Sequence, residues 1–264
     1  MTRCGFAALG IALLSACQIM NLDPPRQKIV DLTHPLDAQT IFWPTETGFV
    51  LEKEFAGTTE RGYFYAANKF SSPEHGGTHL DAPFHFSATG KTVDQIPLDQ
   101  LTGPAVLIDA TSACQGDADY QIKTADFLAW EKRNGKIPAG SIVLLRTGFG
   151  KFWPDRRRYL GTDERGAAAV AKLHFPGLHP EAARWLAEER RIQAVGIDTA
   201  SIDRGQSRLF ETHRALFERD IPAMENLANL ELLPERGFEV IALPMKIAGG
   251  SGAPLRAIAR LPGQ

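Results

Sequence analysis

Three of the seven histidines in the chain lie within eleven residues, together with one aspartate. The four residues are His75, His79, Asp81 and His85. All four positions are odd, so on an extended strand the four side chains would point to the same face. Imidazole nitrogens and a carboxylate that converge on one point can bind zinc, manganese or another divalent transition metal. The spacing therefore predicts a metal-binding strand.

A helix is a poor interpretation of the same segment, although His75 and His79 are four residues apart. Gly76, Gly77 and Pro83 all disfavour a helix interior. No glutamate follows His75, so the helical H-E-x-x-H pattern of zinc proteases is absent. We expect an extended segment that bends at Pro83, because proline cannot donate a ladder hydrogen bond. The alternative is a surface strand with ordinary polar residues. Four groups that can bind metal, all at odd positions within eleven residues, argue against this alternative.

The composition describes an ordinary globular chain. It has 264 residues, 44% of them hydrophobic, and a net charge of −2, which fits one large domain or two small ones. The only cluster of basic residues is 156–158, which follows a proline and suits a solvated loop. We therefore expect no nucleic-acid partner.

The N-terminus has the layout of a secretory signal. A short positive start with Arg3 precedes an apolar run from Phe6 to Leu14, which is too short to span a bilayer. Leu14-Ser-Ala-Cys17 follows and resembles the bacterial lipobox, in which the cysteine is lipidated. A plain cleaved signal and a buried apolar segment remain the alternatives.

This pattern divides the chain into a signal peptide with lipobox (residues 1–17), a tether (18–27) and a folded domain (28–264). Lipidation of Cys17 would place an exported protein on the periplasmic side of a bacterial membrane, held only by its lipid anchor. Gln18 follows the cysteine, where aspartate would resemble the inner-membrane retention signal, so the outer membrane is favoured. Cys114 would then be the only cysteine in the folded domain, which excludes an intramolecular disulfide there.

The folded domain alternates short strands with helices, which is typical of an α/β fold. Helices are expected over residues 125–134, 180–190 and 207–218. Strands are expected over 29–36 (ending in a turn), 63–68, 104–109, 141–147, 192–197, 238–243 and 255–261.

The segment from His75 to His85 resembles the H-x-G-T-H-x-D-x-P-x-H signature of the cyclase family, which includes bacterial kynurenine formamidase and isatin hydrolase. The resemblance continues through most of the chain, in the blocks 30–36, 42–44, 195–199, 225–230 and 243–256. It implies a swivelling β/β/α single domain with a mixed sheet, assembled as a homodimer or homotetramer.

The resemblance also implies roles for individual residues. His75, His79 and Asp81 would bind a first metal ion, and Asp81 could bridge to a second. His213 and Glu225, twelve residues apart, would be the distal ligands. Two further residues complete the site: His85 as the general acid/base and Trp43 as an aromatic wall of the substrate pocket.

These roles predict a metal-dependent hydrolase with one or two Zn²⁺ or Mn²⁺ ions. Water activated by the metal would attack a small aromatic or cyclic amide. Arylformamidase activity, as in tryptophan catabolism, is the leading expectation because Glu225 is present. The export signal favours a first alternative, hydrolysis of isatin, a lactone or another cyclic substrate. The second alternative is a non-catalytic exported lipoprotein that binds metal or a small ligand, and the presence of His85 argues against it.

Overall fold

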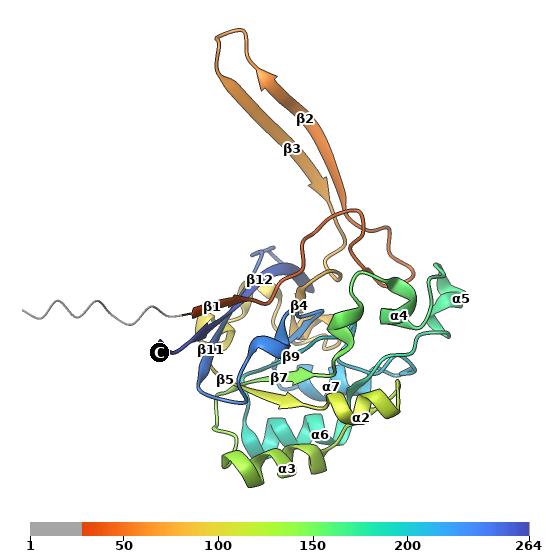
Figure 1. The fold of residues 1–264 in the computed structure, drawn as a ribbon, viewed down its shortest axis with the longest axis vertical. Helices are drawn as coiled ribbons and strands as arrows, with labels where there is room; N and C mark the ends of the chain where they lie inside the picture. The colour runs from red at the N-terminus through yellow and green to blue at the C-terminus, as the bar shows by residue number, and fades with distance from the viewer. Residues whose placement is uncertain (1–27, 264) are drawn as a thin grey trace, which may run out of the picture.

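A mixed β-sheet that closes on itself forms the centre of the molecule (Figure 1). The computed structural model describes residues 28–263, so the predictions for the signal peptide, Cys17 and the tether lie outside the described residues. The strands of this sheet are β1 (Lys28–Asp31), β4 (His79–Asp81), β5 (Thr102–Asp109), β7 (Ile142–Arg146), β9 (Ala194–Ile197), β10 (Ala223–Glu225), β11 (Phe238–Pro244) and β12 (Gly252–Leu261).

Seven of these strands close a ring in the order β12-β11-β5-β7-β9-β10-β4, because β4 also pairs with β12. Strands β5, β7, β9 and β10 run parallel to one another, whereas β4 is antiparallel to both of its neighbours. β1 pairs antiparallel with the outer side of β12. The expected α/β single domain with a mixed sheet is thus confirmed.

Two hydrophobic cores lie on the two faces of this sheet. Successive side chains of β7 alternate between them, as the pleat of a strand requires. Ile142 and Leu144 pack inside the closed sheet, and Val143 and Leu145 pack against the helices outside it. Because both faces are covered, β7 is apolar from Ile142 to Leu145.

The helices lie outside the closed sheet, and α3 and α6 run along its lower side in Figure 1. They are α1 (Leu98–Leu101), α2 (Thr111–Gly116), α3 (Thr124–Asn134), α4 (Arg156–Leu160), α5 (Ala167–Val170), α6 (Pro180–Trp185) and α7 (Glu211–Phe217). A π-turn, η4 (Leu186–Arg190), extends α6. The 3₁₀ turns are η1 (Pro83–His85), η2 (Val93–Gln95), η3 (Phe149–Phe152) and η5 (Leu230–Leu232). Among residues 28–263, no helix has the length and apolar character needed to cross a membrane.

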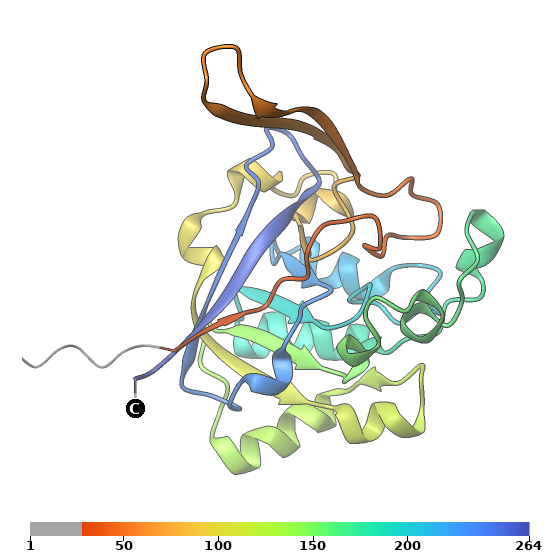
Figure 2. The same cartoon turned by 45° about the horizontal axis from the view of Figure 1, so that its top comes forward.

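Two further pairs of strands lie outside the main sheet. β6 (Gln121–Ile122) and β8 (Gly177–Leu178) form a short parallel pair. β2 (Val50–Thr58) and β3 (Phe64–Ser71) form a long antiparallel hairpin, which we call the arm. Figure 2 shows the arm at the opposite end of the molecule from the helices α3 and α6.

The structure confirms the predicted strands and helices, with differences at their ends. The helix expected over 207–218 begins only at Glu211, because Phe210 before it has a left-handed backbone conformation with φ of 48°. The strand expected over 255–261 already begins at Gly252. Strand β10 was not predicted, because three residues are too few to show a periodicity.

Cys114 lies in α2 and is buried, with 3% of its surface exposed. Burial raises the pKa of its thiol to about 12, so the nucleophilic thiolate is scarce at neutral pH. We expect iodoacetamide at pH 8 to leave Cys114 unmodified in the folded protein and to alkylate it fully in denaturant, as peptide mass spectrometry would measure. Rapid alkylation of the folded protein would contradict this burial.

Candidate metal centre

The shortest strand of the closed sheet, β4, carries two of the predicted metal ligands on one face. His79 and Asp81 are two residues apart and both are buried. β10 pairs antiparallel with β4, in a register that sets Glu225 directly opposite His79. The sheet thus brings a carboxylate from late in the chain next to the histidine motif.

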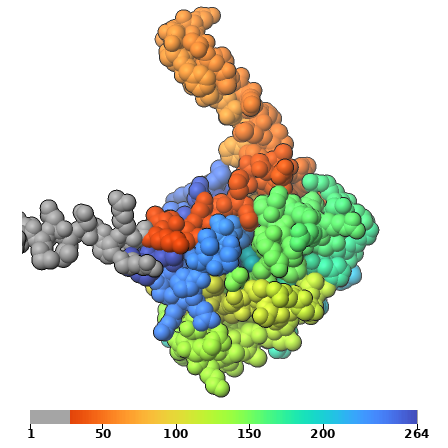
Figure 3. Space-filling model, in the orientation of Figure 1, coloured from red at the N-terminus to blue at the C-terminus, as the bar shows by residue number. Residues whose placement is uncertain are grey.

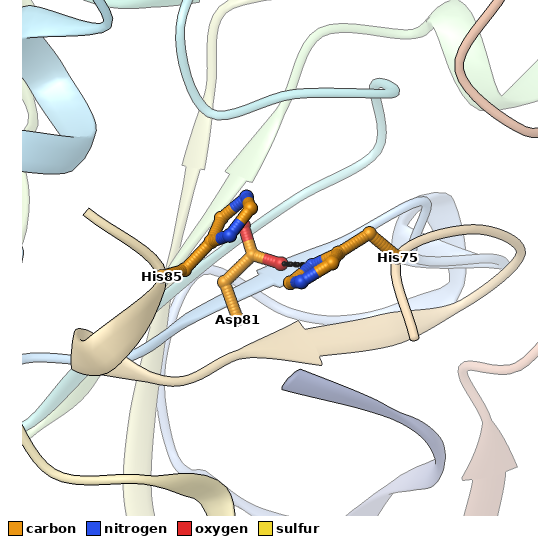
Figure 4. A group of neighbouring side chains, drawn as sticks. All are labelled: His75, Asp81 and His85. Atoms are coloured by element: carbon orange, nitrogen blue, oxygen red, sulfur yellow. Dashed lines mark hydrogen bonds and ion pairs between the residues drawn. The ribbon is translucent and has the colours of Figure 1, made fainter. Parts of the chain in front are cut away.

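His75 and His85 approach Asp81 from outside the strand, so the prediction of one strand carrying all four groups was wrong for these two. His75 lies in the loop before β4, and His85 lies in the 3₁₀ turn η1 after Pro83. Figure 4 shows the Asp81 carboxylate beside the two imidazoles, with Nδ1 of His75 2.6 Å from Oδ1 of Asp81. The rings of His75 and His85 stack with their centres 3.8 Å apart.

The two distal residues named from the resemblance also reach this point. Helix α7 carries His213, whose Nε2 lies 3.1 Å from Oδ2 of Asp81 and 3.2 Å from Oε1 of Glu225. Nε2 of His79 lies 3.0 Å from Oδ1 of Asp81 and 3.6 Å from Oε2 of Glu225. The structure therefore places all five predicted ligands around one buried point.

The charges at this point are strongly coupled. Burial opposes the charged form of His79, but the carboxylates of Asp81 and Glu225 outweigh it and raise the pKa of His79 to about 9. Burial likewise opposes ionisation of Asp81, but the imidazoles of His75, His79 and His213 hold its pKa well below the usual range. Burial and the nearby Asp81 carboxylate raise the pKa of Glu225. Two buried carboxylates thus depend on positive charge beside them.

The donor set fits a divalent cation. It offers imidazole nitrogens and carboxylate oxygens, the ligands of zinc and manganese sites. Two groups of three have ligand atoms within 4.8 Å of one another, His75-Asp81-His85 and His79-Asp81-Glu225. Asp81 belongs to both, as a residue bridging two ions would. The first group includes His85, so this geometry allows His85 either as a ligand or as the expected acid/base.

Asp203 holds His213 in place, a role that the residue pattern alone did not indicate. Its Oδ2 lies 2.6 Å from Nδ1 of His213 and accepts a hydrogen bond from the backbone N–H of the same residue. Oδ1 of Asp203 accepts hydrogen bonds from Ser207 and Thr212. Such a carboxylate fixes the histidine tautomer and leaves Nε2 free to bind metal. The available signal was the position of Asp203 after strand β9, where α/β proteins often place site residues.

Replacing this carboxylate should weaken metal binding without unfolding the protein. We expect Asp203→Asn to lower metal affinity about 10- to 100-fold, because the amide no longer fixes the charge and orientation of His213. Competition with a chelator would measure the change. Asp119→Asn is a matched control, because Asp119 makes a similar 2.6 Å contact with Nδ1 of His174 outside the metal centre. Equal metal affinity in both variants would contradict the assigned role.

Buried hydrogen bonds also support His79. Its Nδ1 lies 3.0 Å from the carbonyl of Gly77, which adopts a left-handed conformation with φ of 59°. The amide of Asn226 donates to the same carbonyl, and the hydroxyl of Tyr159 donates to Oδ1 of Asn226. These contacts fix the ring of His79 with Nε2 toward Asp81.

His75 has a separate support from Glu74 and Ser251. Glu74 accepts hydrogen bonds from the backbone N–H and the hydroxyl of Ser251. That hydroxyl lies 2.8 Å from Nε2 of His75. Glu74 therefore acts on His75 through Ser251.

A cavity of about 220 Å³ opens onto the metal ligands. Trp43, Phe86 and Phe210 line it, and the rings of Phe86 and Phe210 have centres 4.9 Å apart. Trp43 packs edge-on against Phe175, with centres 6.5 Å apart, so its ring is held as one wall. Burial lowers the pKa of His85, which also lines the cavity, to about 4. A larger groove of about 560 Å³, between α3 and the end of β12, contains no histidine.

Known proteins are similar to this chain in both sequence and structure. The family described as "Putative cyclase" matches residues 30–204. An isatin hydrolase of Roseibium aggregatum is 35% identical, over 76% of this chain and 77% of its own. A kynurenine formamidase of Bacillus cereus is 29% identical, over 88% of this chain and 96% of its own. The structure of isatin hydrolase A from Ralstonia solanacearum is 34% identical, with a TM-score of 0.80 over 89% of this chain and 92% of its own.

The closed mixed sheet, the buried cluster of metal ligands and these relatives define a metal-dependent hydrolase that uses a divalent cation. The chain belongs to the cyclase family. The expected class of enzyme and family are therefore confirmed, and the non-catalytic alternative is not favoured.

Proposed function

We propose that the chain hydrolyses the carbon–nitrogen bond of a small aromatic amide, with an N-formylated aromatic amine such as N-formylkynurenine as the leading substrate. The observation that carries this proposal is the aromatic cavity that opens onto five converging metal ligands. Its volume of about 220 Å³ is below the ~300–1,000 Å³ of sites for drug-sized ligands, so it suits one ring or two fused rings. Glu225 supports the formamidase reaction, because a second carboxylate beside Asp81 allows two ions.

The side chains that line the cavity have separate roles in this reaction. Trp43 and Phe210 bind and orient the aromatic ring by stacking and exclude water from it. A bound divalent metal lowers the pKa of its water and polarises the amide carbonyl. His85 faces the same space, and because burial lowers its pKa to about 4, its imidazole is neutral. It would take the proton of the hydroxyl that water adds to the carbonyl carbon and pass it to the departing nitrogen, which is a poor leaving group without a proton. Asp203 and Ser251 keep His213 and His75 oriented throughout.

Hydrolysis of a cyclic amide such as isatin is a second candidate. The similarity to two isatin hydrolases supports it, at 35% and 34% identity. The reaction would use the same groups, with the ring nitrogen as the leaving atom that stays attached to the product.

Parallel assays separate these two candidates. Protein purified without added metal should first be analysed for its metal content, which also decides between Zn²⁺ and Mn²⁺ and between one and two ions. N-formylkynurenine and isatin should then be compared by kcat/KM at equal metal loading. A higher value for isatin would replace the leading candidate with the second. No turnover across a wide amide and lactone panel, at full metal loading, would contradict both.

We further propose that the chain is exported and anchored by a lipid at Cys17, with residues 18–27 as a tether to the domain that follows. The lipobox-like Leu14-Ser-Ala-Cys17 after an apolar run supports this proposal. Labelled palmitate should be incorporated into the protein, and globomycin should block its processing. A soluble, unlabelled mature protein would contradict the anchor. We also propose that the enzyme is a homodimer or homotetramer.

A further inference from the structure

The cavity beside the metal ligands contains a third carboxylate, Glu46, which the proposed reaction does not use. Asp81 and Glu225 belong to the metal centre, whereas Glu46 lies in the loop between β1 and β2 and lines the cavity from there. Its side chain is partly buried, and among residues 28–263 it forms no ion pair and no hydrogen bond. Burying a charge without a partner is costly, so Glu46 marks a place where a ligand can supply the opposite charge.

A tight turn sets Glu46 beside Trp43. The backbone N–H of Glu46 donates to the carbonyl of Trp43, 3.0 Å away, and closes a turn of four residues. The first and fourth residues of such a turn lie close together, and here both line the cavity. The Glu46 carboxylate takes no part in the hydrogen bond of the turn, so local backbone structure does not account for a charged side chain at this position.

Contacts with α4 and the segment after it hold this loop in place. Nη1 of Arg156 donates to the carbonyl of Phe42 at 2.9 Å, and the backbone N–H of Gly166 donates to the carbonyl of Pro44. Figure 3 shows the residues before the arm, in red-orange, packed beside the green segment that includes α4. Arg156 thus binds a backbone carbonyl of the loop and leaves the charge of Glu46 without a counter-ion.

The rest of the cavity lining also favours a positively charged group. Trp43, Phe86 and Phe210 contribute aromatic rings, whose faces attract cations. No lysine or arginine is among the described residues that line the cavity. Aromatic rings together with an unpaired carboxylate are the groups that recognise an ammonium ion. A carboxylate on a ligand would find no basic side chain to bind outside the metal centre.

We propose that Glu46 selects aromatic amides that carry an ammonium group. This inference rests on the proposed hydrolysis of an aromatic amide and specifies the class of substrate. The amide carbonyl lies at the metal ligands, and the ammonium group binds the carboxylate of Glu46 beside Trp43. N-formylkynurenine has an ammonium group and isatin has none, so Glu46 favours the first of the two candidate reactions. The carboxylate of N-formylkynurenine adds no contact with the residues of this cavity, so a substrate without it is bound as well or better.

Three related substrates test this selection in the full, metal-loaded chain. The first is N-formylkynurenine, the second is the same molecule without its carboxylate, and the third is the second with a methyl group in place of the ammonium. We expect kcat/KM for the second to equal or exceed that for the first. For the third it should be about 10- to 100-fold lower than for the second, because a charge-assisted hydrogen bond is lost. The loss should appear mainly in KM, since the ammonium lies outside the bond that breaks.

Glu46→Gln removes the charge and keeps the size of the side chain. We expect it to lower the ratio of kcat/KM between the ammonium and methyl substrates by about 10- to 100-fold. Glu189→Gln is the matched control, because Glu189 is an exposed carboxylate in η4, outside the cavity, and this variant should keep the ratio of the unmodified chain. Equal losses on both substrates in Glu46→Gln would overturn the inference and reduce Glu46 to a structural part of its turn.

Calorimetric binding of the hydrolysis product of the second substrate, an aromatic amine with the same ammonium group, needs no turnover. This product should bind the unmodified chain about 10- to 100-fold more tightly than it binds Glu46→Gln. Turnover of all three substrates at similar kcat/KM, or a larger loss on removing the carboxylate than on removing the ammonium, would overturn the selection and leave the proposed hydrolysis standing. No turnover, with product binding that depends on Glu46, would overturn the hydrolysis alone. No turnover and equal binding by both proteins would overturn both.

Discussion

Asp81→Asn should remove both the metal and the activity of this enzyme. Asp81 lies within 3.1 Å of a ring nitrogen of each of three histidines, His75, His79 and His213. It also belongs to both groups of candidate ligands. An amide of the same shape keeps the packing but loses the charge that the cation requires. We expect metal content to fall close to zero and kcat/KM to fall by about 1,000-fold or more, because activation of water by the metal is lost.

Metal content by mass spectrometry and hydrolysis at saturating metal measure the two effects. Asp99→Asn is a suitable control, because Asp99 is an exposed carboxylate at the start of α1. His79→Ala should behave like Asp81→Asn, since His79 faces both Asp81 and Glu225. A fully active Asp81→Asn enzyme with normal metal content would refute the assigned metal centre.

The part of this site that lies between His75 and His85 in the sequence was predictable from residue types and spacing. The histidines and the aspartate lie within eleven residues, so their proximity needs no tertiary structure. The predicted bend at Pro83 is the 3₁₀ turn η1. The detailed geometry was not predictable, because Gly76 and Gly77 before β4 and Pro83 after it take His75 and His85 out of the strand. Turns before and after β4 bring these two residues to Asp81. The alternation of side chains along a strand does not apply to turns, so it could not predict their positions.

The other part of the site, formed by His213 and Glu225, depends on tertiary structure. Glu225 faces His79 because β10 pairs with β4, and β10 has only three residues. So short an apolar segment carries no periodicity, and the resemblance to a family was needed to name Glu225 and His213. The role of Asp203 was not predictable, because it depends on α7 folding back toward the end of β9.

The arm shows a different limit of sequence reasoning. An extended segment was expected around residues 63–68, and β3 confirms it. Its aromatic residues would ordinarily indicate a buried strand. They are exposed, because the arm leaves the body of the chain, and a sequence does not show which strands the body of a fold leaves uncovered.

His85→Gln should separate proton transfer from metal binding. If His85 is the acid/base, the variant keeps its metal and loses about 100- to 10,000-fold in kcat on an amide substrate. If His85 is instead a ligand with His75 and Asp81, metal content falls together with activity. His174→Gln is the control, because His174 pairs with Asp119 outside the site.

The leaving group distinguishes a proton donor from a residue that only shapes the cavity. An amide nitrogen must be protonated as it departs, whereas a phenol ester with an acidic phenol departs without help. We therefore expect His85→Gln to lose less than about 10-fold in kcat on such an ester. An equal loss on amide and ester would contradict proton delivery, and it would reduce His85 to a positioning role through its stacking on His75. Preserved metal, a large loss on the amide and a small loss on the ester would together assign the proton to this imidazole.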